Sequence, residues 1–509
     1  MHDTSANNKR IAKNMFVLYV RMFLMMAISL YTSRVVLRTL GVEDFGIYNV
    51  VGGIVSMMGV INGAMSVSTT RYLTFELGKG DIGRLKQTFS MCVNIYAILA
   101  IILFVLSETV GVWFLNTQLI IPEERMDAAN WVFQFSIIST IFSLLTNPYN
   151  AVIISREKMN IYAYISLVDA ILNLAIVYLL LVISFDKLIV YGLMLMILRI
   201  LNTSIYYVYC NKKYQESRYF FYWETVLFKD LLSYTGWNLF GSTASLVKGQ
   251  GLNILLNMFF NPSVNAARGI AFQVNSAVSL FFTNFYTAVR PQITKYYAQQ
   301  DLKNMIKLVF RSSKMSFFLI LLISLPLIIE APYVIQLWLG QLPEFVVPFM
   351  RLILVITAID SMAHPLMTTV HATGKIALYQ SLVGTMTILN IPISYVFLHL
   401  GHEPVIVFEI SLIISVVNLF LRLWIVKRLV DFPVLRYIKE VFFNGLFVAI
   451  FSSILPVWVN RIVKDDIVGV GIVCLLAVLS TIVVTYYTGL NKSERQFILE
   501  FAKKKLKRK

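Results

Sequence analysis

The feature of this sequence that most constrains its fold is a long series of apolar windows, each about 20 residues long and separated by short polar loops. A window of that length can cross the hydrocarbon core of a bilayer as a helix, which satisfies its own backbone hydrogen bonds where lipid offers no partners. The sequence therefore predicts an all-α membrane protein with about fourteen transmembrane helices. These spans lie near 15–35, 45–66, 89–115, 129–150, 161–184, 188–210, 231–260, 266–289, 312–339, 346–372, 376–400, 404–426, 437–459 and 467–488.

Composition and charge agree with this class. Of the 509 residues 58% are hydrophobic and only 14% are charged, which excludes an ordinary soluble protein. The formal net charge of +17 does not indicate a nucleic-acid partner, because 32 of the 44 Lys and Arg residues fall in alternate segments and only 7 in the others. By the positive-inside rule, the multi-pass chain is predicted to have both termini in the cytoplasm.

The two halves of the sequence are related by a weak internal repeat with an offset of about 219 residues. RYLTFELGKGDIGRLKQTFS starts at Arg71 and RPQITKYYAQQDLKNMIKLVF at Arg290, and each reaches an aspartate, Asp81 or Asp301. Duplicated halves are common in transporters. The predicted divisions are a six-helix lobe at 1–210, a cytoplasmic linker at 211–230, a second six-helix lobe at 231–426, two further helices within 427–490 and a basic tail at 491–509.

A lysine lies in the middle of the predicted seventh span, LLSYTGWNLFGSTASLVKGQGLNILLNMFF. A charge at the centre of a span costs about 2.5–3.5 kcal/mol on insertion scales, so Lys248 is predicted to face a water-filled cavity and an anionic substrate. Gly249, Gln250 and Gly251 follow it and are expected to loosen the helix there. The alternative is a lysine that extends to the interface or pairs with a carboxylate only for assembly.

Other charged residues also fall within the spans. Arg21 in the first span favours a cavity role, whereas Asp169, Asp360 and His364 are candidates for coupling to H⁺ or Na⁺. The competing interpretation is that these acidic and histidine side chains pair with buried basic groups for structural reasons.

Motifs of soluble catalysis are missing from the sequence: it has no phosphate loop with GK[ST], no HExxH and no GxSxG. Its 3 cysteines have no metal-ligand spacing. We therefore expect a secondary transporter and not an enzyme, with no metal site and no cofactor.

The N-terminal sequence resembles a known family. NKRIAKNMFVLYVRMFLMMAISLYTSRVVLRTLGVEDFGIYNVVGGIVSMMGVINGAMS followed by RYLTFELGKGD is similar to the Wzx-type polysaccharide flippases. These belong to the multidrug/oligosaccharidyl-lipid/polysaccharide (MOP) exporter superfamily. The resemblance implies two MATE-like six-helix lobes around a cavity, plus two extra helices. It also implies transport of undecaprenyl-pyrophosphate-linked oligosaccharide across the bacterial inner membrane for surface polysaccharide such as O-antigen or capsule.

Such a pyrophosphate would need several cationic partners. We expect Lys248, Arg21, Arg34 and Arg268 to line the cavity, with Arg71 and Arg290 at its cytoplasmic mouth. Related lipid flippases carry arginines in the first, second and eighth spans, and this chain differs by its lysine in the seventh and by the absence of a basic residue within the second.

The expected partners are the lipid-linked substrate, the membrane and other glycan assembly proteins, and the expected state is a monomer. Two alternatives remain. One is a multidrug exporter of organic cations from the same superfamily, and the other is a scaffold that organises glycan assembly without transport.

Overall fold

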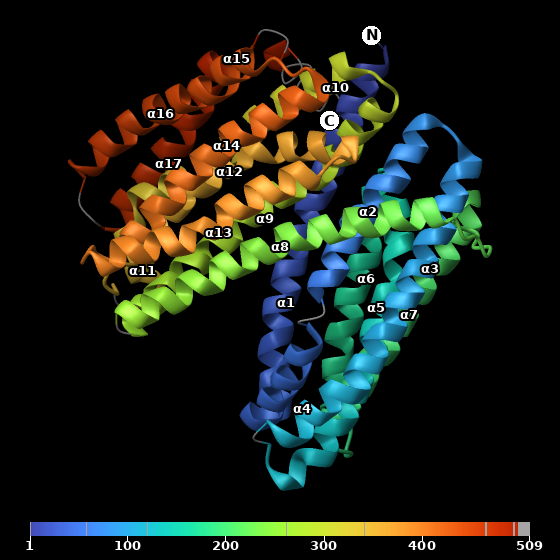
Figure 1. Cartoon of the computed structure of the whole chain (residues 1–509). Helices are drawn as coiled ribbons and strands as arrows, with labels where there is room; N and C mark the ends of the chain where they lie inside the picture. The colour runs from blue at the N-terminus through green and yellow to red at the C-terminus, as the bar shows by residue number, and fades with distance from the viewer. Residues whose placement is uncertain are drawn as a thin grey trace, which may run out of the picture. The chain divides into compact units, whose positions relative to one another are not determined.

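The computed structural model describes residues 2–56, 59–119, 121–260, 262–340, 342–463, 466–491 and 494–496. Within these ranges every regular element is a helix, and no strand occurs (Figure 1). The predicted all-α fold class is therefore confirmed.

The first part of the chain forms seven α-helices and two short helical segments. These are α1 His2–Ser56, α2 Gly59–Lys79, α3 Ile82–Leu106, the π-helix Ser107–Gly111, α4 Val112–Thr117, α5 Glu123–Ser155, α6 Met159–Leu179, α7 Lys187–Lys213 and the 3-10 helix Gln215–Ser217. The long helix α5 packs against α1, α2, α3 and α7.

Ten α-helices follow. They are α8 Thr225–Phe259, α9 Pro262–Ala298, α10 Leu302–Ile329, α11 Ala331–Leu339, α12 Val346–Thr373, α13 Ala377–His399, α14 Ile406–Val430, α15 Val434–Tyr437, α16 Asn444–Asn460 and α17 Ile467–Val484, with π-helices at Ile438–Phe443 and Thr485–Gly489. In this part α12 packs between α10 and α14, and α13 packs against α14.

Two compact units divide the chain. Unit 1 comprises Met1–Thr243 and Thr294–Gln300, and unit 2 comprises Ala244–Ile293 and Asp301–Lys509. Both boundaries fall inside helices, the first within α8 and the second within the last turns of α9.

Eleven helices within the described residues are long and apolar enough to cross a membrane. The other three predicted spans also lie in helices. The span 45–66 runs from α1 into α2 and includes residues 57–58, which are outside the described ranges, and the remaining two lie in α8 and α9. These helices fail the same measure because polar residues interrupt their apolar character.

The internal repeat has a clear structural counterpart in the helix caps. Asp81 caps α3 by accepting a hydrogen bond from the Arg84 backbone N–H at 2.8 Å, and Asp301 caps α10 by accepting one from that of Asn304 at 3.1 Å. An aspartate at this position satisfies a backbone donor that the first helical turn leaves free. The two similar loops therefore end in the same local structure.

The LGVEDFG motif forms the turn that separates the two segments of α1. Gly41 adopts φ 81° and ψ 173°, a left-handed backbone that a side chain would strain. Asp44 then pairs with Arg125 of α5 through two short contacts of 2.9 and 2.6 Å. Arg125 also reaches Asp186 at 2.6 Å, and Asp186 caps α7. One arginine thus ties three helices of unit 1 together beside the turn.

A buried glutamate joins separate parts of unit 1. Glu157, in the turn between α5 and α6, lies 2.6 Å from Lys295 Nζ and 2.8 Å from Arg10 Nε. Its backbone carbonyl accepts a hydrogen bond from Asn14 at 3.1 Å. The last turn of α9 is thereby held in unit 1, although most of that helix belongs to unit 2.

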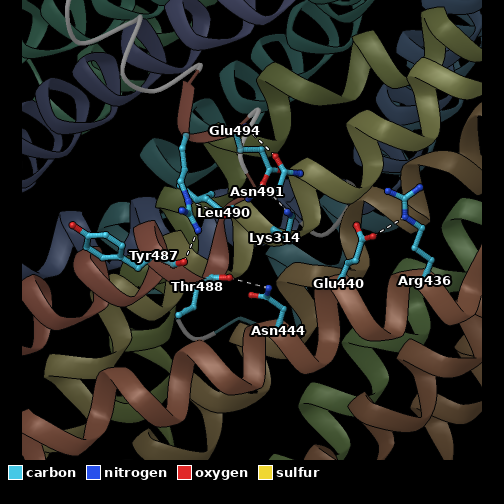
Figure 2. A network of polar contacts seen from close by, with 10 residues as sticks. Lys314, Arg436, Glu440, Asn444, Tyr487, Thr488, Leu490, Asn491 and Glu494 are labelled. Atoms are coloured by element: carbon cyan, nitrogen blue, oxygen red, sulfur yellow. Dashed lines mark hydrogen bonds and ion pairs between the residues drawn. The ribbon is translucent and has the colours of Figure 1, made fainter.

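The two C-terminal helices α16 and α17 pack against each other and against α10. Figure 2 shows the polar contacts beyond α17, where Glu494 pairs with Lys314 of α10 at 2.7 Å. Both side chains are buried, and Asn444 donates to the Thr488 carbonyl at 3.2 Å. Residues 497–509, which hold most of the predicted basic tail, lie outside the described ranges.

Candidate functional site

Lys248 lies on an unbroken helix. The expectation that Gly249, Gln250 and Gly251 loosen the backbone is wrong, because α8 runs as one helix from Thr225 to Phe259. Side-chain packing explains one of the glycines. A Cβ atom at Gly251 would overlap the side chain of Ile391, so this glycine lets α8 approach α13 closely.

The other glycine contributes its carbonyl group. Gly249 O accepts a hydrogen bond of 2.7 Å from Arg268 Nη2 of α9, and Arg268 Nη1 donates to Asn253 Oδ1 at 3.1 Å. The guanidinium also lies over the Phe272 ring, 4.4 Å from its centroid. The structure therefore brings Arg268 next to Lys248, as the sequence predicted, and holds it in a fixed orientation.

A polar stripe on α12 faces the same helix pair. Its members follow at helical spacing: Thr357, Asp360, His364 and Thr368. Thr357 donates to Asn275 of α9 at 2.6 Å, and Thr368 donates to Tyr286 of α9 at 2.8 Å. The His364 ring lies 4.4 Å from the Phe282 ring and 5.3 Å from that of Tyr286. His364 Nδ1 is buried and has no hydrogen-bond partner among the described residues.

Asp360 is the anionic member of this stripe. Its Oδ1 accepts a hydrogen bond of 2.7 Å from Ser415 of α14, and Arg422 Nη1 of the same helix lies 3.7 Å from that oxygen. Arg422 also donates from Nε to the Tyr379 hydroxyl at 3.3 Å. Lys248 interacts electrostatically with both Asp360 and Arg268. Unit 2 thus gathers three cations and one carboxylate from α8, α9, α12 and α14.

The predicted residues of unit 1 form a separate group. Arg21 lies over the Tyr162 ring, 4.5 Å from its centroid, and its Nε is buried without a hydrogen-bond partner in the described part of the chain. Asp169 of α6 is paired, because Arg199 Nη1 of α7 lies 3.3 Å from each of its carboxylate oxygens and Asn202 donates to it at 2.9 Å.

The three remaining candidates are not part of either group. Arg71 is buried, with its guanidinium over the rings of Tyr72 and Phe75 at 4.6 and 4.7 Å. Arg290 is partly buried near the inner end of α9. The side chain of Arg34 lies outside the part of the chain that the structure describes. Their predicted roles stay predictions.

Ion pairs outside the spans fasten the segment before α8 to unit 1. Arg84 contacts both carboxylate oxygens of Glu224, at 2.5 and 3.0 Å, and Tyr222 donates to the same carboxylate at 2.6 Å. These hydrogen bonds, from Arg84 first and then Tyr222, lower the pKa of Glu224 to about 2. Arg156 pairs in the same way with the buried Glu216 at 2.6 Å. The predicted linker is therefore anchored and not a free tether.

Sequence reasoning did not assign a role to Arg199 or Arg422. Both were visible as arginines within apolar spans, in α7 and α14, the last helices of the two predicted lobes. Their partners come from other helices at distances in sequence that no periodicity reveals. Among the described residues, no three His, Cys, Asp or Glu side chains are grouped as a metal site requires.

Comparison with known proteins supports this architecture. Residues 18–179 match the model of the MatE family. A multidrug resistance MATE family transporter of the MOP superfamily, solved in an outward-facing conformation, superposes with a TM-score of 0.71 at 12% identity, covering 84% of this chain and 96% of that one. This chain has the fold of a MATE transporter.

Two further MATE-fold structures extend the comparison. A MOP superfamily transporter from Pyrococcus furiosus, described as having a binding pocket of reversed polarity that suggests a different function, matches with a TM-score of 0.68 at 12% identity, over 82% of this chain and 96% of that one. A Vibrio cholerae MATE transporter matches with a TM-score of 0.64 at 15% identity, over 84% and 98%. No curated protein matches the sequence.

Proposed function

We propose that this MATE-fold protein is a secondary transporter that flips lipid-linked oligosaccharides with a pyrophosphate head group across the bacterial inner membrane. The observation that carries the proposal is the charge of the polar group in unit 2. Lys248, Arg268 and Arg422 outnumber the single carboxylate of Asp360, so the group has a net charge of two positive units.

A group of this charge selects anions. Each cation within a membrane-spanning helix is costly, so an arrangement that places three of them together indicates an anionic ligand that offsets the cost. Arginine suits phosphate because its planar N–H groups donate to two oxygens at once, and lysine adds a mobile point charge. An organic cation, the substrate of the multidrug alternative, would be repelled by the same group.

The fold is compatible with either polarity. The related transporter from Pyrococcus furiosus is described as having a binding pocket of reversed polarity. We infer that the MATE fold accepts changes in the sign of its binding group without loss of the helix arrangement. This supports an anionic substrate for the present chain.

In this mechanism the chain binds the head group and leaves the lipid tail in the bilayer. Lys248 and Arg422 contact phosphate oxygens, and Arg268, fixed by Gly249 and Asn253, adds positive potential beside Lys248. Coupling to H⁺ or Na⁺ is a further prediction. Of its candidates, Asp169 and Asp360 are paired with arginines, whereas His364 keeps a free ring nitrogen among the described residues.

The proposal is tested by surface glycan display in a strain that lacks this protein, complemented with the native chain or with Lys248→Ala. We expect the variant to reduce display at least about tenfold, because a hydrogen bond to a charged group contributes about 1.5–3 kcal/mol. Lipid-linked oligosaccharide should accumulate on the cytoplasmic side.

Two controls separate charge from folding. Lys248→Arg keeps the cation and should retain most of the display, and Lys187→Ala removes a loop cation at the start of α7 and should change nothing. Membrane abundance is measured for every variant. Normal display with Lys248→Ala at native abundance would contradict the proposal, and a changed resistance to organic cations with normal display would favour the multidrug alternative.

A further inference from the structure

The carboxylate of Asp360 lies in an unusual place. It is near the middle of α12, a 28-residue helix, yet its side chain keeps 42% of its accessible surface. A charged group at this depth is stable only where it faces water or a compensating charge. Its neighbours Ser415 and Arg422 show that it faces other polar groups of unit 2 and not lipid.

Its pairing with Arg422 is loose. A charge-assisted N–H to carboxylate hydrogen bond is normally about 2.7–2.9 Å long, but the nearest contact between these two groups is 3.7 Å. Ser415 holds the same oxygen at 2.7 Å. The carboxylate is thus kept near Arg422 but is not locked to it.

Arg422 needs an anion nearby. Its side chain is 16% exposed, and its other described hydrogen bond goes to the neutral hydroxyl of Tyr379. A cation removed from water without a counter-charge is strongly disfavoured. Asp360 meets this need while the transporter is empty, and it also interacts with Lys248.

We propose that Asp360 is a resident counter-ion, which a dianionic phosphate or pyrophosphate group displaces from Arg422 and Lys248 on binding. This inference rests on the proposed function and names the residue that sets specificity within it. The net charge of two positive units in the empty group is neutralised by a dianion. A singly charged anion neutralises only half of it, so competition with Asp360 favours the more highly charged head group.

The counter-ion also gives release a physical cause. When the substrate leaves, the carboxylate returns to the two cations and replaces the lost interactions, which keeps the head group from being held too tightly. Removing the carboxylate should therefore raise affinity and slow turnover together. A residue that only stabilises the helices would not produce that pair of effects.

The experiment measures binding of farnesyl pyrophosphate to the full-length protein in lipid nanodiscs. We expect Asp360→Asn to bind at least about fivefold more tightly than the native protein, because the asparagine keeps the hydrogen bond to Ser415 and removes the competing charge. Arg422→Ala should bind at least about tenfold more weakly. Asp169→Asn, which removes a carboxylate in unit 1, is the matched control and should leave the affinity unchanged.

Ser415→Ala provides a test with the opposite sign. Without its hydroxyl the carboxylate is free to move onto Arg422, so binding should weaken about two- to threefold. This variant tests the inference even if Asp360→Asn does not fold, as judged by its size-exclusion profile and thermal unfolding.

The outcomes distinguish the two levels of the argument. Native protein that binds farnesyl pyrophosphate, with Asp360→Asn or Ser415→Ala showing unchanged or opposite shifts, overturns the counter-ion and leaves the proposed function intact. Native protein that binds ethidium but no farnesyl pyrophosphate overturns both.

Discussion

The two arginines in α7 and α14, the last helices of the predicted repeats, are neutralised in different ways. Arg199 lies 3.3 Å from both oxygens of Asp169, which also accepts a hydrogen bond from Asn202. Arg422 lies 3.7 Å from one oxygen of Asp360, which it shares with Ser415. The carboxylate of Asp169 is 18% exposed and that of Asp360 is 42% exposed.

The origin of each carboxylate explains the difference. In unit 1 it comes from α6, the helix that directly precedes α7, so the ion pair joins consecutive helices. In unit 2 it comes from α12, two helices before α14, and lies in a stripe that also faces α9. The comparison teaches that similar arginines serve different ends: the pair in unit 1 supports packing, and the pair in unit 2 is available for exchange with a ligand.

The largest expected effect comes from removing each arginine in turn. We expect Arg422→Ala to lower glycan display per molecule at least about tenfold, because it removes a phosphate donor. Arg199→Ala should lower the abundance of the protein in the membrane and leave display per remaining molecule nearly unchanged. Display and abundance are measured on the same cells, and equal losses per molecule in the two variants would end the distinction between the pairs.

The carboxylates should differ in stability. Removing one partner of a fully buried pair costs about 3–5 kcal/mol, and we reduce this to about 2 kcal/mol for Asp169→Ala because Arg199 is 39% exposed. For Asp360→Ala we expect less than about 1 kcal/mol, since its pair is longer and more open. Unfolding in detergent by a chemical denaturant measures both, and a greater loss for Asp360→Ala would reverse our assignment.

The glycines of α8 separate close packing from helix breaking. Gly251→Ala should cost about 1 kcal/mol, because its Cβ overlaps Ile391, whose flexible end can partly move away. Gly249→Ala is the control, as its Cβ meets nothing within 4 Å. Thermal unfolding of the two variants decides the point. A loss at Gly249 that equals the loss at Gly251 would show that the helix needs its flexibility.

The smallest effect concerns pH and the exposed pair of Arg84 and Glu224. The pKa of Glu224 falls from its ordinary 4.5 to about 2, so the folded state favours the ionised form. This stabilisation is fully present above about pH 5 and is lost as the pH falls from 4.5 toward 2. Glu224→Gln should therefore destabilise by less than about 1 kcal/mol near pH 7, and its difference from the native protein should shrink near pH 3. A difference that stays constant with pH would contradict this account.

Much of the fold followed from the sequence because bilayer crossing and helix capping are local requirements. Apolar length located the spans, and the spacing of Asp81 and Asp301 in the repeat located two equivalent caps. The cations Lys248 and Arg268 were also found, since a charge within a span is visible in any apolar window. The partners of Arg199 and Arg422 were not, because they depend on which helices pack together.

The glycines after Lys248 show the same limit. Their composition favours a flexible helix when α8 is considered alone. Their actual use depends on Ile391 of α13 and on Arg268 of α9, which lie far from them or on another helix. A glycine in a span therefore has to be interpreted with the surface that it meets.

The division of α9 has a consequence for biogenesis. Unit 1 includes residues 294–300, which hold Lys295 against Glu157. A ribosome that has completed the first seven helices has therefore not yet made all of unit 1, and nearly ninety further residues must be synthesised and inserted before Glu157 gains its lysine. Two half-proteins cut in the segment before α8 would be expected to assemble only when expressed together, with the second half supplying the missing turn.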